Sequence, residues 1–402
     1  IVDWIADLDT HGGEARQYYV VHQEEPGTLS AKLRAAKKDP TKIKNLKISG
    51  KIDACDFYFM RDSMDVLQAV NLKETQIEGA WECWAPIDGD RRYFYLGGLP
   101  EESTDKEVIE AFRLAYPEIK SYYYVDYACR PNEIPQNAFA NKTYLTHIAF
   151  PEEIEKIREN AFSACSLLSG ALIIPDNVIE IGENAFVNCY NLTSLQLPYG
   201  LETLGGWAFS GCFNFSGELS LPESVINLGQ SCFYGCYGFT GNLVIPNAIT
   251  IIPDQCFRDC RGLIGNLEIP NGVSSIGNYA FAGCGFNGTL TLPNSITTIY
   301  EGAFGGCNFQ GELNLPINIK CIPTYCFTST AFSSIPKFPD GLLEIGTDAF
   351  SYCWRLSGVL EFPESLVSIK NNAFASCPTL EGIVLPKELV AISDGAFIDC
   401  FG

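Results

Sequence analysis

The chain has 402 residues, an apolar fraction of 47% and a formal net charge of −21. Lysine and arginine are absent from residues 159–257 and 262–319, which excludes a nucleic-acid-binding footprint there and disfavours binding to anionic membranes. No stretch of 18 uncharged apolar residues occurs, so we expect no helix that spans a membrane.

The segment from Ile1 to Tyr127 predicts a divergent cap with short helices. We expect one helix over residues 29–38, after the turn signal Pro26-Gly27, and a second within residues 53–65. Thr104 and Glu107 form a capping-box pattern that predicts a third, amphipathic helix ending near Tyr116. Such an atypical end is expected of a repeat protein, because terminal units must close its core.

Short alternating segments in the same region predict the strands of divergent coils. They are evenly spaced along the chain, at residues 46–48, 70–72 and 93–96. Val125 and Tyr127 then take the strand positions of a first regular unit that ends at Phe139. The sequence therefore predicts that the coil pattern begins inside the cap.

Two residue types recur with a fixed period in the rest of the chain. Phenylalanine recurs at an interval that varies by only one position, at 139, 162, 186, 209, 233, 257, 281, 304, 327, 350, 374 and 397. Proline precedes all but the first of these at a constant distance, at positions 151, 175, 198, 222, 246, 270, 293, 316, 339, 363 and 386. Only the segment from Phe to the next Pro varies in length, so one connecting turn absorbs the variation.

Aliphatic residues stand three and six positions after each proline from Pro175 onward, without a polar exception. The first series is Val178, Leu201, Val225, Ile249, Val273, Ile296, Ile319, Leu342, Leu366 and Leu389. The second is Ile181, Leu204, Leu228, Ile252, Ile276, Ile299, Ile322, Ile345, Ile369 and Ile392. Such regularity predicts side chains stacked in columns inside a dry core.

The alternating residues before each proline predict a short strand, which the proline ends because it cannot donate to a ladder. Stacked strands about 4.8 Å apart give a parallel sheet on one face, and the opposite wall is expected to hold short strands, turns or 3₁₀ pieces. We therefore predict an α/β-type repeat solenoid, with the cap and divergent coils in residues 1–127 and a regular array in residues 128–402.

Seventeen cysteines are present, and most occupy fixed positions of the repeat. Ten stand three positions after the repeat phenylalanine: 165, 189, 212, 236, 260, 284, 307, 353, 377 and 400. The pairs Cys232/Cys236 and Cys256/Cys260 have a spacing that superficially resembles a metal site, but no histidine lies near them. Buried free thiols are favoured over a metal site and over disulfides between coils, which remain geometrically conceivable. We expect no metal and no cofactor.

Catalytic motifs are absent from the sequence. A nucleophile paired with histidine would have to use His11, His22 or His147, and none of the common hydrolase, metalloprotease or phosphate-binding motifs occurs. His147 precedes a predicted strand and is expected to be solvated. We predict that the chain is not an enzyme.

The residue after each repeat cysteine forms a candidate binding column. It contains Tyr190, Phe213, Tyr237 and Arg261, and Trp207 and Tyr234 occupy nearby positions of the same coils. Aromatic residues and arginine are enriched in interface hot spots, and aromatic rings can also stack on sugars. The alternative is that these rings cover a turn and belong to the packing. The outward residues of the strand face are a second surface, expected to be small, polar and solvated.

The repeat resembles the BspA-like, treponemal-type class of bacterial leucine-rich repeats. Residues 178–189 read VIEIGENAFVNC and residues 273–284 read VSSIGNYAFAGC, and the resemblance covers about residues 125–402. It implies a right-handed leucine-rich-repeat coil in a secreted or lipid-anchored surface protein, with adhesion or host-protein binding in some members. It fixes no ligand.

The leading hypothesis is a non-enzymatic, adhesin-like scaffold at a bacterial cell surface that binds a host or bacterial protein. The alternatives are an accessory surface subunit that binds glycan or peptide for a nutrient-uptake complex, and a structural spacer. We expect an extracellular monomer with no nucleic-acid partner. The chain starts at Ile1 without a charged-then-apolar leader, so any signal peptide of the precursor is expected to be absent from this sequence.

Overall fold

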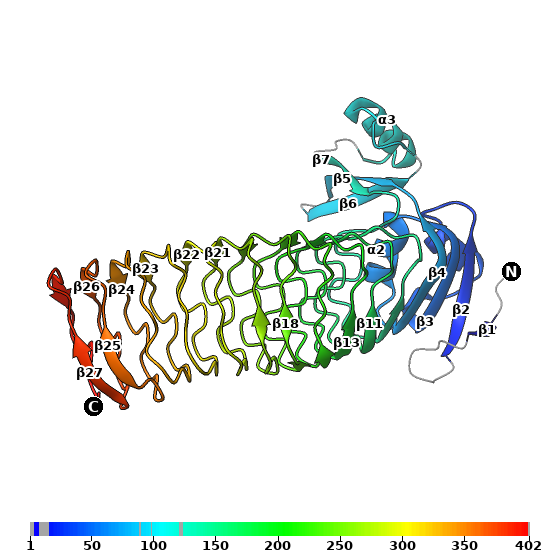
Figure 1. Ribbon diagram of the computed structural model, residues 1–402. Coiled ribbons are helices and arrows are strands. Elements are labelled where there is room, and N and C mark those ends of the chain that lie inside the picture. The colour runs from blue at the N-terminus through cyan, green and yellow to red at the C-terminus, as the bar shows by residue number, and fades with distance from the viewer. Residues whose placement is uncertain (1–3, 8–15, 88–89, 98, 120–123, 401–402) are drawn as a thin grey trace. The chain divides into compact units, whose positions relative to one another are not determined.

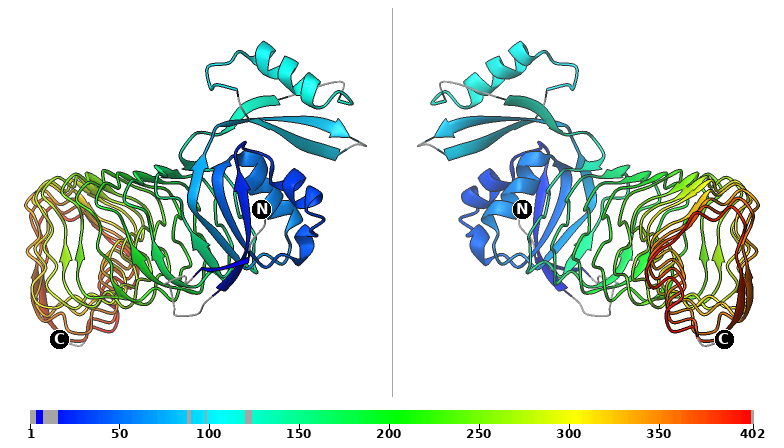
Figure 2. Two further views of the ribbon diagram at one scale, coloured as in Figure 1. Left: turned by 90° about the vertical axis from the view of Figure 1, so that its right-hand side faces the viewer. Right: turned by 90° about the vertical axis from the view of Figure 1, so that its left-hand side faces the viewer.

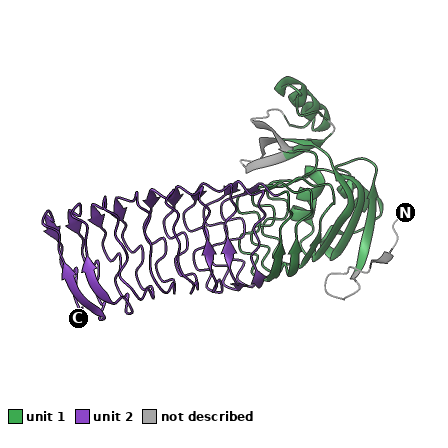
Figure 3. Ribbon diagram, in the orientation of Figure 1, with its two compact units in different colours: residues 1–200 green, residues 201–402 purple. Residues whose placement is uncertain are grey.

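The computed structural model describes residues 4–7, 16–87, 90–97, 99–119 and 124–400. The chain divides into two compact units, residues 1–200 and 201–402, drawn in green and purple in Figure 3. Each unit is described by itself below. A domain boundary near residue 127 stays a prediction. No helix in the described ranges is long and apolar enough to cross a membrane.

Unit 1 begins with a sheet in the order β1-β2-β3-β4-β9. Its strands are β1 (Trp4–Asp7), β2 (Arg16–Gln23), β3 (Asn45–Ile52), β4 (Ala69–Ile77) and β9 (His147–Ala149). β1 and β2 are antiparallel, and the other neighbours are parallel. Leu46 pairs with Val70, which confirms the predicted strands at residues 46–48 and 70–72.

Helical segments of unit 1 follow the predicted capping signals. Next to the first sheet (Figure 2) lie α1 (Leu29–Ala35), the 3₁₀ turn Pro40–Lys42 and α2 (Ala54–Ser63). Asp53 caps α2, and its carboxylate accepts a hydrogen bond from the backbone N–H of Cys55. All three predicted helices are present, with α1 shorter than predicted.

The segment between β4 and β9 departs from the prediction. It holds β5 (Ala80–Ile87), β6 (Asp90–Gly97), α3 (Asp105–Ala115) and β7 (Tyr124–Cys129), drawn in cyan to blue-green in Figure 1. Both β6 and β7 pair antiparallel with β5, and α3 contributes Val108 and Phe112 to a small core with Trp81. The predicted coil strands at residues 93–96 and at Val125 and Tyr127 are therefore wrong, because these residues belong to an antiparallel insertion.

The strand wall of the regular coils is parallel, as predicted. In unit 1 it holds β11 (Gly170–Ile173) and β13 (Leu192–Gln196). In unit 2 it holds β15 (Gly217–Glu218), β17 (Phe239–Thr240), β18 (Leu243–Val244), β20 (Leu267–Glu268), β25 (Gly358–Glu361) and β27 (Leu380–Val384). The residue two positions before each repeat proline is exposed in every coil from Ile173 to Val384. This agrees with the prediction that the outward side of the strand wall is solvated.

The opposite wall consists of two-residue strands that end on the second inner aliphatic column. In unit 1 these are β8 (Glu133–Ile134), β10 (Lys156–Ile157) and β12 (Glu180–Ile181). In unit 2 they are β14 (Thr203–Leu204), β16 (Asn227–Leu228), β19 (Ile251–Ile252), β21 (Ser275–Ile276), β22 (Thr298–Ile299), β23 (Cys321–Ile322), β24 (Glu344–Ile345), β26 (Ser368–Ile369) and β28 (Ala391–Ile392). Short strands joined by turns confirm the prediction for this wall.

A turn centred on the repeat phenylalanine holds successive coils together. Within each unit the neighbouring rings stack with centroids 5.1–5.7 Å apart. The residues two before and two after the phenylalanine have left-handed backbones, such as Gln255 (φ 54) and Asp259 (φ 61) around Phe257. The N–H groups of Gln255, Phe257 and Asp259 donate to carbonyls of the next coil at 2.7–2.9 Å, and the corresponding bonds recur along each unit at 2.7–3.2 Å. The turn is therefore a third ladder beside the two strand walls.

The repeat cysteines complete this turn. Their thiols donate to the carbonyl oxygen of the repeat phenylalanine one coil back, as from Cys260 Sγ to Phe233 O at 3.2 Å, and the same bond recurs at Cys165, Cys189, Cys236, Cys284, Cys307, Cys353, Cys377 and Cys400. These thiols are free and, except for the half-buried Cys400, buried. The prediction of packed, free thiols is confirmed for these positions.

Candidate partner-binding surface

The first part of the candidate surface is a stack of side chains in unit 2. Phe213, Tyr237 and Arg261 each follow a repeat cysteine, and the N–H of each donates to the carbonyl two residues earlier at 2.9 Å. The Phe213 and Tyr237 rings stack at 5.1 Å with an interplanar angle of 12°. The Arg261 guanidinium carbon lies 5.2 Å from the Tyr237 ring centre. Identical tight turns in successive coils therefore align the three groups.

Glycine at position 235 makes room for this stack. Its backbone is left-handed (φ 73), and a Cβ there would lie 3.2 Å from Cε1 of Phe213. Any larger residue would be strained in this backbone and would press on the ring. The local sequence around Cys236 is thus adapted to the neighbouring aromatic residue.

A second stack lies beside the first. The Arg258 guanidinium carbon is 5.9 Å from the Tyr234 ring centre and 5.0 Å from that of Tyr279. The Tyr279 hydroxyl donates a hydrogen bond to Glu301. Burial, together with this bond and the charge of Glu301, raises the pKa of Tyr279 to about 12. The phenol therefore stays a neutral donor that fixes the ring next to the guanidinium.

Asp259 joins the two stacks. Its Oδ1 lies 3.1 Å from Nη2 of Arg261, and its Oδ2 lies 3.7 Å from Nε of Arg258. These arginines are the only basic residues between Arg158 and Lys320. We define Phe213, Tyr234, Tyr237, Arg258, Arg261 and Tyr279 as the aromatic–arginine patch.

Both ring faces of Tyr237 are covered. Tyr237 has Phe213 from the preceding coil on one side and Arg261 from the following coil on the other. Phe213 and Tyr237 are nevertheless 39% and 40% exposed, because their edges point outward. A sugar needs a free ring face for stacking, whereas apolar edges beside guanidinium groups suit a protein surface.

The structure brings four of the six predicted site residues together. Phe213, Tyr237 and Arg261 form one stack and Tyr234 joins the other. Trp207 is half-buried, in the left-handed position (φ 52) two residues before Phe209. Tyr190 lies in unit 1 and is 38% exposed. Neither of these two belongs to the patch as defined.

Sequence reasoning missed Arg258 and Tyr279. The signal was available for Arg258, since it and Arg261 are isolated cations in a long acidic stretch. Tyr279 stands two residues before a repeat phenylalanine, a position that meets its neighbours only when coils are stacked. The candidate role of the whole patch stays a prediction.

Two of the three histidines lie in the described part of the chain. Nδ1 of His22 lies 3.0 Å from the Ser49 hydroxyl in an exposed pair. His147 is the first residue of β9 and is 9% exposed, so the prediction that it is solvated is wrong: the strand begins one residue earlier and turns it inward. His11 lies outside the described residues. Among the described residues, no group of three or more histidine, cysteine or acidic side chains could hold a metal ion.

Comparison with known proteins agrees with the repeat. The family described as BspA type leucine rich repeat region matches residues 132–264, 228–357 and 344–402, which is more than half of the chain. A leucine-rich repeat protein from Bacteroides ovatus is 26% identical, with a TM-score of 0.54, and the match covers 67% of this chain and 74% of that one. No curated protein matches the chain.

Two further solved structures are similar over part of their length. The T. pallidum leucine-rich repeat protein is 28% identical, with a TM-score of 0.34, over 38% of this chain and 69% of that one. A leucine-rich cell surface protein from Faecalibacterium prausnitzii is 20% identical, with a TM-score of 0.38, over 70% of this chain and 83% of that one.

Proposed function

Because the chain belongs to the BspA-type leucine-rich-repeat family, we propose that it is a non-enzymatic scaffold that binds a protein partner at a bacterial cell surface. Repeat solenoids of this kind are typical binding scaffolds, since stacked coils present an extended surface. The observation that carries the proposal is the aromatic–arginine patch. It gathers exposed aromatic edges and the two isolated arginines of a long acidic stretch in one place.

The geometry of the patch favours a protein partner over a glycan. Tyr237 is enclosed between Phe213 and Arg261, so a sugar ring finds no free face there. A partner can instead cover the ring edges with apolar side chains and accept hydrogen bonds from the guanidinium groups, as interface hot spots do. An adhesin-like role follows if that partner belongs to a host or to another cell.

Photo-cross-linking tests the class of partner. Tyr237 is replaced with p-benzoylphenylalanine, and the purified chain is irradiated on intact bacterial and host cells. We expect a discrete cross-linked protein from this position and none from the same replacement at Tyr300, which is 49% exposed in unit 2 but outside the patch. Equal products from both positions, or a glycan array signal that depends on Tyr237, would contradict a protein site at the patch.

The captured protein then allows the affinity to be measured. The double variant Phe213→Ala/Tyr237→Ala should weaken its binding at least tenfold, because such anchors contribute about 2 kcal/mol or more. Tyr199→Ala with Tyr300→Ala is the matched control, since both tyrosines are exposed. Antibody labelling of intact cells of the source bacterium tests the location, and labelling only after lysis would argue against a surface protein.

A further inference from the structure

The strand wall of unit 1 is interrupted between two successive coils. Among the described residues, β9 is the last strand of the first sheet, and β11 pairs with β13 alone. The coils remain tied at both ends of the interruption, by Ser169 N–H to Thr146 O at 3.2 Å and by Asn177 Nδ2 to Glu152 O at 3.2 Å. Between these ties no strand pairing joins β9 to β11 in the described residues.

A change of strand phase accounts for the interruption. Before Pro151 the buried residues are His147, Ala149 and Phe150, which lie four, two and one positions before it. In the next coil they are Leu172 and Ile174, three and one positions before Pro175. An offset of one residue turns the faces of a strand over, so β9 follows the register of β4, and the phase of the next coil begins only at Phe150.

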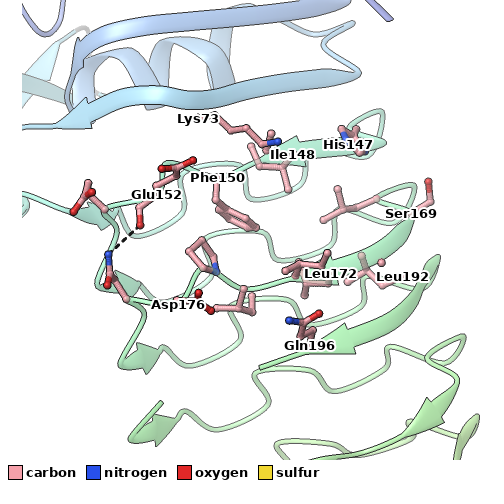
Figure 4. A pocket seen from close by; sticks show the side chains of 18 residues that line it. Lys73, His147, Ile148, Phe150, Glu152, Ser169, Leu172, Asp176, Leu192 and Gln196 are labelled. Atoms are coloured by element: carbon pink, nitrogen blue, oxygen red, sulfur yellow. Dashed lines mark hydrogen bonds between the residues drawn. The ribbon is translucent and has the colours of Figure 1, made fainter. Parts of the chain in front are cut away.

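A pocket of about 610 Å³ opens at this interruption. Its apolar part consists of Ile148, Phe150, Leu172 and Ile173, and Ile173 is 42% exposed. Figure 4 shows the Phe150 ring with Lys73 on one side and Asp176 on the other. The volume lies in the range of pockets that enclose small ligands or short peptide segments.

The charged rim of the pocket is mostly acidic. Glu152, Glu153 and Asp176 line the pocket, and each lies in the chain just after the proline that ends a strand segment. All three are exposed. Within the described ranges none of these carboxylates forms an ion pair. Lys73 lies above Phe150 at the same end of the pocket as Glu152, while Asp176 lies at the other end. With three carboxylates against one lysine, the rim attracts a ligand cation.

We infer that this pocket binds a short peptide segment that carries a basic side chain next to an apolar one. The apolar side chain covers Phe150 and Ile173, and the basic group lies at Glu152, Glu153 and Asp176. The peptide backbone runs between β9 and β11, which are not paired with each other in the described structure, as a strand added at a sheet edge does. The site is independent of the aromatic–arginine patch, which lies in the other unit.

Fluorescence anisotropy with the whole chain and two labelled probes tests the inference. The probes are the capped peptides acetyl-Leu-Lys-Leu-amide and acetyl-Leu-Glu-Leu-amide. We expect the lysine probe to bind at least tenfold more tightly than the glutamate probe. In the double variant Glu152→Gln/Asp176→Asn, the affinity for the lysine probe should fall at least tenfold.

Two further variants separate this site from general attraction to an acidic protein. Glu183→Gln/Glu202→Gln removes the same charge from exposed positions outside the pocket and should leave binding unchanged. Ala171→Trp fills the pocket from an exposed position of β11 without changing charge and should abolish binding. Equal losses in the two charge variants, or undiminished binding by Ala171→Trp, would overturn the inference.

Discussion

The carboxyl group of Asp53, the buried N-cap residue of α2, makes the stability of the fold depend on pH. Asp53 is 1% exposed, and its Oδ2 has no hydrogen-bond partner among the described residues. Burial, and then the neighbouring Asp56 carboxyl, raises the pKa of Asp53 to about 7. A carboxyl with a raised folded pKa stabilises the fold at acid pH, and that stability is lost as the pH rises through the folded value.

The substitution Asp53→Asn tests this linkage. Asparagine keeps an N-cap acceptor and removes the cost of an unpartnered buried charge. The wild-type chain should lose stability between pH 5 and pH 8, while the variant should lose less and be more stable at pH 8 by on the order of 1–3 kcal/mol. Denaturant unfolding at both pH values measures the difference. Parallel pH profiles for the wild type, the variant and the exposed control Glu102→Gln would rule the linkage out.

Residue patterns predicted burial better than they predicted contacts. The aliphatic and cysteine positions were recognisable as core because they recur from coil to coil. The thiol bond from Cys260 to Phe233 O was not recognisable, since its partner belongs to the preceding coil and the contact depends on how coils stack. The same holds for Arg258 and Tyr279 in the patch.

Among the elements, the phenylalanine turn contributes more to stability than the exposed stack beside it. Phe257 is fully buried between Phe233 and Phe281, at 5.7 and 5.5 Å between ring centres. Tyr237 stacks on Phe213 and Arg261 at the surface and is 40% exposed. Substitution of Phe257 therefore tests core packing, whereas substitution of Tyr237 tests partner binding.

Alanine substitutions of these two rings should differ clearly. Phe257→Ala leaves a cavity between two rings and should cost about 3–5 kcal/mol. Tyr237→Ala, on a turn at the surface, should cost less than about 1 kcal/mol. Thermal and denaturant unfolding measure both effects. A comparable loss for Tyr237→Ala would assign this ring to packing and remove it from the binding surface.

The elements that were not predicted from the sequence are those that do not follow the 23–24-residue repeat. In the insertion β5–β7, the capping box predicts α3 correctly, but residues 93–96 keep the interval of the repeat and therefore resemble a coil strand. The dipeptide Asp88-Gly89, which tight hairpins prefer, was the signal against that interpretation. The interruption after β9 was hidden for another reason: strand phase depends on the pairing partner, and β9 pairs with β4.

For the whole molecule, the repeat made the solenoid predictable and the charge sets its response to salt. The side-chain columns, the turn positions and the strands that end at proline all predict the same coil. The repeat period is therefore sufficient to predict the solenoid fold. Between residues 159 and 319 there are twelve acidic side chains and two arginines. Repulsion among like charges opposes the compact state at low ionic strength.

Adding salt should therefore stabilise the chain. We expect the melting temperature to rise when sodium chloride is increased from about 10 to about 200 mM, since the Debye length shortens from about 30 Å to under about 10 Å. The triple variant Glu202→Gln/Glu218→Gln/Glu268→Gln, at exposed positions of unit 2, should respond less. A melting temperature that is unchanged by salt in both proteins would contradict this account.

The turn around the repeat phenylalanine also bears on how such a chain changes in evolution. Successive coils offer one another the same three donors and receive them on the same three carbonyls. Deletion or duplication of one full repeat would therefore bring matching coil surfaces together. Deletion or duplication of part of a repeat would instead place backbone N–H donors opposite side chains. Recombination between the similar segments of such a gene can thus lengthen or shorten the array in whole steps, while the residues on its outside diverge freely.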